Sequence, residues 1–190
     1  SNHVAQQALA VVLFFRRDIA GCRSAAERAL ALNPLDGSNE AIFLITFTGD
    51  WERGCGLIRW AMEQNPHHPR WYGLILAINE YRVGNYRGAV DEAVKANMPD
   101  GTWKAAVLAA AHGQLGEVEA ARAALRALPA SEADFARSAR DLLEKWFDPR
   151  LVEHLLEGLS KAGLSSDVNR PVPAPSADPA TRTYLAKFSL

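Results

Sequence analysis

The chain has 190 residues, of which 48% are hydrophobic and 23% charged, and its 21 Lys and Arg residues against 22 Asp and Glu leave a formal net charge of -1. The apolar fraction excludes a wholly disordered chain, and the balanced charge argues against a protein that binds nucleic acid or anionic membranes. Two cysteines cannot build a disulfide framework, which favours a reducing compartment and a cytoplasmic location. The longest apolar run, from Ala8 to Phe15, is too short to span a membrane.

Two markers recur along the alanine-rich chain, and each has a local structural meaning. The first marker is a helical segment that ends at or near an Asn-Pro pair, where proline blocks continuation of the helix. Each such segment contains an alanine, and these alanines, Ala29, Ala61 and Ala93, are 32 residues apart. The second marks a tight turn before a new helix, and it recurs as Gly49-Asp50-Trp51, Gly84-Asn85-Tyr86 and Gly116-Glu117-Val118. Because two independent markers recur in phase, we predict stacked helical hairpins in preference to an irregular bundle.

In chain order, the markers predict four hairpins that span residues 3–34, 35–68, 69–101 and 102–130. The second hairpin fits best, with 34 residues and its turn at Gly49. The first hairpin carries Arg16-Arg17-Asp18 where the others have a turn glycine. One hairpin cannot bury its own apolar face, so we expect the four to stack into a single row.

Residues 131–164 predict two further helices that cap the last hairpin. Ser131 is expected to begin the first of these helices and Asp148-Pro149 the second, which Gly163 ends. Residues 165–190 are rich in proline and predict an extended tail. The end of the tail is apolar again, so we expect it to dock on a protein surface through Tyr184, Leu185 and Phe188.

The hairpins resemble tetratricopeptide (TPR) repeats, which have a period of about 34 residues and a two-helix unit. Small residues such as Ala29, Ala61 and Ala93 stand where the two helices of such a repeat cross. The resemblance implies an all-α fold, a TPR-like α-α superhelix (a right-handed solenoid) of about four hairpins with two C-terminal capping helices and an extended tail.

Seven strings point to a narrower group of proteins, and the match covers roughly residues 8–164. The strings are Gly49-Asp-Trp-Glu-Arg53, the segment from Asn65 to Tyr72, the segment from Tyr81 to Tyr86, Asn97-Met-Pro99, Gly113-Gln-Leu-Gly116, Lys145-Trp-Phe-Asp-Pro149 and the segment from Leu155 to Leu164. They are similar to the C-terminal TPR region of bacterial class III adenylate and guanylate cyclases of the rhizobial type. The resemblance implies a regulatory, non-catalytic module for protein–protein interaction, cut from a longer signalling protein. A TPR module of a winged-helix transcriptional regulator, or a stand-alone TPR adaptor, is the alternative.

No group of residues in the sequence predicts catalysis, a metal site or a cofactor site. His67 and His68 are neighbours on a loop, with no Cys or carboxylate at ligand spacing, so a plain loop is favoured over a metal site. Cys22 and Cys55 lie near the starts of second helices and are predicted to be buried thiols. His154 is expected on the outer face of the last helix.

The first helices of the hairpins should line the concave groove of a TPR array. The helical period places there Asn39, Glu40, Phe43 and Phe47 of the second hairpin, Trp71, Leu74 and Tyr81 of the third, and Trp103 and Val107 of the fourth. Because this set is largely apolar and aromatic, the expected partner is an extended peptide with apolar side chains. The tail residues Tyr184, Leu185 and Phe188 would provide one, in cis or from a second copy in a homodimer.

Overall fold

The structure, a computed structural model, describes residues 2–33, 39–96, 98, 101–129 and 131–164. Among these residues it contains ten α-helices and no strand, which confirms the prediction of an all-α fold. The helices are α1 (His3–Phe15), α2 (Ile19–Leu32), α3 (Asn39–Phe47), α4 (Trp51–Gln64), α5 (Trp71–Arg82), α6 (Tyr86–Lys95), α7 (Thr102–Leu115), α8 (Val118–Arg126), α9 (Glu132–Glu144) and α10 (Pro149–Lys161).

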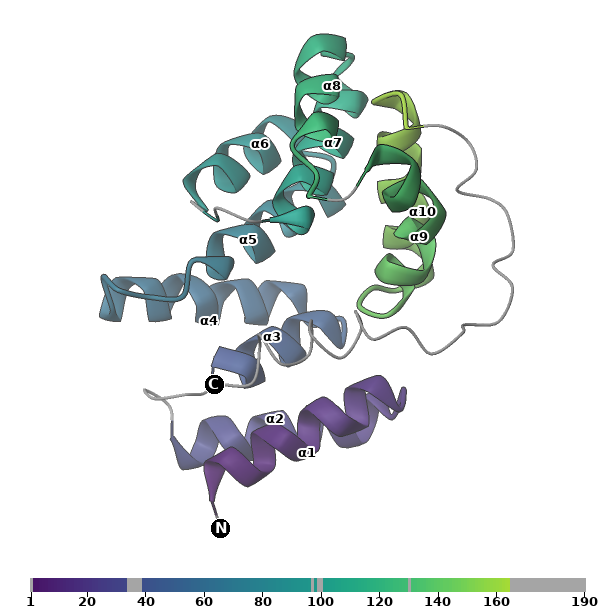
Figure 1. Cartoon of the computed structure of the whole chain (residues 1–190). Coiled ribbons are helices and arrows are strands. Elements are labelled where there is room, and N and C mark those ends of the chain that lie inside the picture. The colour runs from purple at the N-terminus through teal and green to yellow at the C-terminus, as the bar shows by residue number, and fades with distance from the viewer. Residues whose placement is uncertain (1, 34–38, 97, 99–100, 130, 165–190) are drawn as a thin grey trace.

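The first eight helices lie side by side in consecutive pairs, which follow one another as a row (Figure 1). Within the pairs α1 packs on α2, α3 on α4, α5 on α6 and α7 on α8, and between the pairs α2 contacts α3, α4 contacts α5 and α6 contacts α7. The turn inside each pair is at most three residues long. Such a short reversal needs a left-handed residue, and Gly49 (φ 103°), Gly84 (φ 84°) and Gly116 (φ 72°) provide it.

Arg17 occupies the corresponding left-handed position of the first turn, with φ 63°. A residue with a Cβ atom loses about 1–2 kcal/mol in this conformation. The side chain compensates in part, because its guanidinium donates a hydrogen bond to the backbone carbonyl of Glu144, the last residue of α9. The strained turn therefore places the Arg17 guanidinium at the carboxyl end of α9, a helix distant in the sequence. A positive charge is favoured at this end of a helix because of the helix dipole.

The strain at Arg17 predicts a difference between two variants. Arg17→Gly and Arg17→Ala both remove the hydrogen bond to Glu144, but only the glycine also removes the backbone strain. We expect the glycine variant to be more stable than the alanine variant by about 1 kcal/mol. Urea denaturation measures this difference as a change in the free energy of unfolding, and equal stabilities would contradict a strained first turn.

The caps predicted for the last two helices are confirmed. Ser131 Oγ accepts a hydrogen bond from a backbone N–H in the first turn of α9 at 3.1 Å. Asp148 Oδ1 accepts two, from the backbone N–H groups of Arg150 at 3.0 Å and Leu151 at 3.3 Å. Gly163 (φ 101°) lies just beyond the end of α10. The side chains of Ser131 and Asp148 thus satisfy N–H groups that have no partner inside their own helix.

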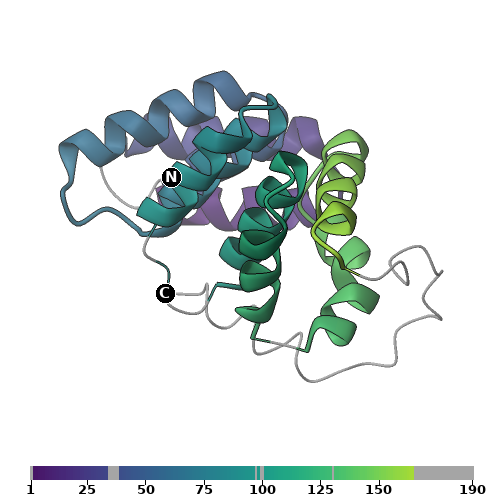
Figure 2. The ribbon, with the colours of Figure 1, turned by 90° about the horizontal axis from the view of Figure 1, so that it is seen from above.

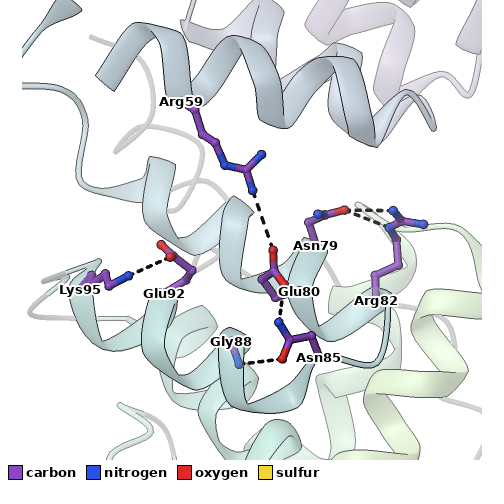
Figure 3. A network of polar contacts seen from close by, with 8 residues as sticks. All are labelled: Arg59, Asn79, Glu80, Arg82, Asn85, Gly88, Glu92 and Lys95. Carbon is purple, nitrogen blue, oxygen red and sulfur yellow. Dashed lines mark hydrogen bonds and ion pairs between the residues drawn. The ribbon is translucent and has the colours of Figure 1, made fainter. Parts of the chain in front are cut away.

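Polar contacts join α4, α5 and α6 on one side of the row (Figure 3). Glu80 of α5 accepts a hydrogen bond from Asn85 Nδ2 at 2.8 Å and lies 3.8 Å from the guanidinium of Arg59 on α4. Asn85 also caps α6, because its Oδ1 accepts a hydrogen bond from the backbone N–H of Gly88 at 3.1 Å. The turn and the cap are thus linked to the neighbouring pair of helices.

The C-terminal helices α9 and α10 run back along the row (Figures 1 and 2). They were predicted to cap the last hairpin, and α10 does pack on its first helix, α7. Their connecting turn extends much farther, to the first two pairs. The Trp146 ring lies 5.9 Å from the Phe14 ring of α1, and the Phe147 ring lies 5.2 Å from the Phe47 ring of α3.

The α7–α10 contact is close because glycines stand where the two helices cross. A Cβ atom at Gly113 would lie 2.2 Å from the carbonyl oxygen of Gly158. A Cβ atom at Gly158 would lie 2.8 Å from the carbonyl oxygen of Ala110. Since these distances exclude any side chain, the two backbones meet directly, and this contact sets the path of α10.

Candidate functional site

A cavity of about 470 Å³ lies where three turns meet: the α1–α2 turn, the α3–α4 turn and the α9–α10 turn. Side chains from segments more than a hundred residues apart therefore face one another in it. Its aromatic lining residues are Phe14, Phe47, Trp51, Trp146 and Phe147, and we call it the aromatic cavity.

The aromatic rings of the cavity contact one another mostly edge to face. The Phe47 ring lies 5.3 Å from the Trp51 ring and 5.2 Å from the Phe147 ring, with interplanar angles of 81° and 66°. Edge-to-face contacts of this kind stabilise a fixed arrangement of rings. The cavity thus has apolar walls held by the residues of three separate turns.

Four charged residues also line the cavity: Arg17, Glu144, Asp148 and Glu153. These groups have partners within the chain. Arg17 donates to the Glu144 carbonyl, Asp148 caps α10, and Glu153 accepts a hydrogen bond from Arg140 at 3.2 Å. The hydrogen bonds from Arg140 lower the pKa of Glu153, so this carboxylate stays charged. Apolar walls with a charged border suit an apolar side chain whose backbone remains outside.

Two of the predicted groove residues contribute to this region. Phe47 lines the aromatic cavity, and the Trp103 ring lies edge-on to the Phe147 ring at 5.6 Å. Leu74 and Val107 are buried in the core, so they pack against helices of this chain and do not face an open groove.

Tyr81 is also buried, and α10 covers it. Its hydroxyl donates a hydrogen bond to the backbone carbonyl of His154 at 2.7 Å and accepts one from Gln114 Nε2 at 3.3 Å. Burial raises the pKa of Tyr81, so the phenol remains a donor. Where a peptide was expected beside this side chain, the structure has α10.

The other predicted groove residues lie outside the cavity lining or outside the described part of the chain. Trp71 is half-buried, with its ring edge-on to the Tyr72 ring at 4.6 Å. The residues whose side chains the structure does not describe are Asn39, Glu40, Phe43 and the tail residues Tyr184, Leu185 and Phe188.

The prediction that His154 lies on an outer face is wrong. Its ring lies 4.6 Å from the Tyr81 ring, and its Nε2 lies 2.9 Å from the hydroxyl oxygen of Tyr86. The physical reason is the path of α10, which packs along α7 and so brings His154 toward α5 and α6. A helix that only capped the end of the row would have left this face in solvent.

Cys22 and Cys55 are buried, as predicted. Burial raises the pKa of both thiols to about 11. At pH 8 only about one thiol in a thousand is then the reactive thiolate. We expect Ellman's reagent to leave both cysteines of the folded chain unmodified for many minutes and to modify two thiols at once in guanidinium chloride. Rapid modification of either thiol without denaturant would contradict this burial.

Further titratable side chains form ion pairs away from the cavity. Hydrogen bonds from Arg87 and then from His112 lower the pKa of Glu117, and His112 Nδ1 lies 2.6 Å from its carboxylate. His68 stacks on the Tyr72 ring at 5.8 Å. Within the described ranges, no three or more His, Cys, Asp or Glu side chains are grouped so that they could hold a metal ion.

Phe14, Trp146 and the role of Arg17 were not predicted from the sequence. Arg17 carried a usable signal, because it stands where the other turns have glycine. Trp146 and Phe147 follow the end of α9, and two large aromatic residues in a helix-ending turn indicate a contact elsewhere in the fold. Nothing local in the sequence indicates which helices they contact.

No helix among the described residues has the length and apolar character needed to cross a membrane. Comparisons with protein-family models, with curated proteins and with solved structures find no match.

Proposed function

We propose that the chain is a TPR-like module, a right-handed solenoid that binds other proteins and performs no catalysis of its own. The observation that carries this proposal is the aromatic cavity at the junction of three turns. Further support comes from the glycine turns and the paired helices, which follow the chain at the spacing of TPR repeats. Helical-repeat arrays of this kind function mainly as binding surfaces.

The proposed ligand is a peptide segment that inserts an aromatic or large aliphatic side chain into the aromatic cavity. The rings of Phe47, Trp51 and Phe147 provide apolar walls for such a side chain. Charged side chains, among them Arg17 and Glu144, border these walls, so the polar backbone of the peptide can stay in water while its side chain is buried. The partner would therefore be recognised chiefly by this anchor, since a few buried side chains carry most of the binding energy of a protein interface.

A peptide selection tests the proposed ligand. A random peptide library displayed on phage is selected against the chain, and we expect enrichment of peptides with one or two aromatic or aliphatic anchors. Trp146→Ala, which removes a wall of the cavity, should weaken the best peptide about tenfold or more. Trp60→Ala is the matched control, because Trp60 is exposed on α4 and does not line the aromatic cavity. Equal loss in both variants, with unchanged stability, would sink the proposed site.

For the longer protein, we propose a cytoplasmic bacterial signalling protein that resembles an adenylate cyclase, in which this module regulates the effector domain. The alternative is a winged-helix transcriptional regulator or a stand-alone adaptor. Formation of cyclic AMP from ATP by the product of the natural gene, with and without residues 3–164, separates these two proposals. A rate that changes on deletion supports the cyclase, whereas no activity in either form supports the alternative.

A further inference from the structure

Residues 184–190 differ in composition from the part of the tail that precedes them. Residues 165–183 contain no aromatic side chain and no apolar side chain larger than valine. The next seven residues include Tyr184, Leu185, Phe188 and Leu190, and we call residues 184–190 the tail cluster. The tail cluster lies outside the described residues, but its composition is that of a segment with large anchor side chains.

The aromatic cavity suits the side chains of the tail cluster. Its volume of about 470 Å³ and its aromatic walls are appropriate for one or two large apolar side chains. The groove in which the tail was expected is not open at its centre, because α10 covers Tyr81 there. A second cavity, of about 580 Å³ between α2, α3 and α4, has Trp60 as the one aromatic side chain among its described lining residues. The aromatic cavity is therefore the better match.

The charges around the aromatic cavity favour the tail cluster over an acidic segment. Among the described lining residues, the charged ones are three acids and one base: Glu144, Asp148, Glu153 and Arg17. Arg140 pairs with Glu153 from outside the lining, so three carboxylates are accompanied by two guanidinium groups. Residues 179–190 carry two basic side chains and no acidic one. Charge complementarity of this kind selects the correct partner more than it adds affinity.

The tail is long enough to return to the aromatic cavity. The first turns of α10 line the cavity through Pro149 and Val152, whereas the described residues end at Leu164, just past the other end of this helix. The 13 residues of α10 rise by about 20 Å. From Leu164 to Tyr184, a flexible linker of this length has a root-mean-square span of about 25 Å. When a linker matches the required distance, the effective concentration of the tethered segment is highest, about 1 mM.

We propose that the tail cluster binds in cis in the aromatic cavity, with Tyr184 and Phe188 as its anchors. This inference rests on the proposed function, because it names an occupant for the same binding site and thereby its regulation. A partner peptide must displace the tail before it binds. If the tail cluster has an intrinsic Kd of about 100 μM, an effective concentration of about 1 mM keeps the cavity about 90% occupied and weakens a partner about tenfold.

The tryptophan side-chain N–H signals of the ¹⁵N-labelled 190-residue chain test the proposal by NMR. In a variant with both Tyr184→Ser and Phe188→Ser, the signals of Trp51 and Trp146 should shift, because the tail leaves the cavity that they line. The signal of Trp60, which lines the second cavity, should stay in place. A synthetic peptide of residues 180–190, added to this variant, should return both shifted signals toward their original positions.

Val172→Ser is the matched control, because it removes an apolar side chain from the tail outside the tail cluster. It should leave every tryptophan signal in place. Unchanged Trp51 and Trp146 signals in the doubly substituted chain overturn the proposal. It is also overturned if only the Trp60 signal shifts, which places the tail in the second cavity. Signals that change with protein concentration between about 20 and 500 μM indicate a tail from a second copy, and they overturn binding in cis as well.

The peptide selected on phage separates a failure of this inference from a failure of the proposed function. It should bind the doubly substituted chain about tenfold more tightly than the unmodified chain, because the tail no longer competes. Equal affinity for the two chains overturns the tail as occupant but leaves the aromatic cavity as a binding site. If neither the selected peptide nor the tail substitutions shift the signals of Trp51 and Trp146, both proposals are wrong.

Discussion

Phe14→Ala is expected to destabilise the chain by about 3–5 kcal/mol, the range for removing a buried phenylalanine ring. Phe14 is 1% exposed, and its ring contacts the Trp146 ring at 5.9 Å. It therefore connects the first pair of helices to the α9–α10 turn, which is distant in the sequence. Guanidinium or urea denaturation, followed by circular dichroism, measures the loss in the free energy of unfolding.

The neighbouring residue provides the control for this prediction. Phe15 is the next residue of α1 and carries the same side chain, but it is 41% exposed, and its ring contacts the Trp146 ring edge to face at 5.2 Å. Phe15→Ala should cost less, about 1–2 kcal/mol, because part of its ring is already in solvent and only its contacts on one side, such as that with Trp146, are lost. If the two variants lost the same stability, α1 would not pack with the register described, and the aromatic cavity would lack one wall.

Gly113→Ala is the second change with a large expected effect. The added Cβ atom would lie 2.2 Å from the carbonyl oxygen of Gly158 and 2.8 Å from the backbone nitrogen of Ala162. Both are backbone atoms of α10 or its end, so α10 must move away from α7. Overpacking of this kind costs about 2–3 kcal/mol. For a chain of this length, the melting temperature should fall by about 8 °C.

Gly56→Ala is the matched control for Gly113→Ala. Gly56 lies inside α4, is exposed, and has nothing within 4 Å of the position its Cβ atom would take. Alanine should therefore raise the stability by up to about 1 kcal/mol through its higher helix propensity. The opposite signs of the two substitutions distinguish a backbone contact between α7 and α10 from a general effect of glycine in helices. A stabilising Gly113→Ala would contradict that contact.

The local features of the fold could be predicted because each depends on residues that are close in the sequence. Examples are the glycine turns after helices, the Ser131 cap of α9 and the start of α10 at Asp148-Pro149. In each of them the hydrogen-bond donors and acceptors lie within a few residues of one another. The helix ends were predicted for the same reason. These features require no knowledge of which helices lie side by side.

The path of α9 and α10 could not be predicted in this way. It depends on the close approach of Gly113 and Gly158 and on contacts of Phe147 with Phe47 and Trp103, all of which are long-range. The helical period identifies an apolar face but does not say what covers it. For this reason Tyr81 was assigned to an open groove, and His154 was placed on the wrong side of its helix.

The indole resonances of the chain test whether a partner inserts a side chain into the aromatic cavity, as proposed above. A ¹⁵N-labelled sample is titrated with the peptide selected on phage, and the Trp side-chain N–H signals are followed by NMR. Trp51 and Trp146 line the cavity, whereas Trp60 and Trp71 do not. We predict that the first two signals shift at a common affinity and that the last two stay in place. Shifts confined to Trp60 or Trp71 would contradict the assignment of the binding site.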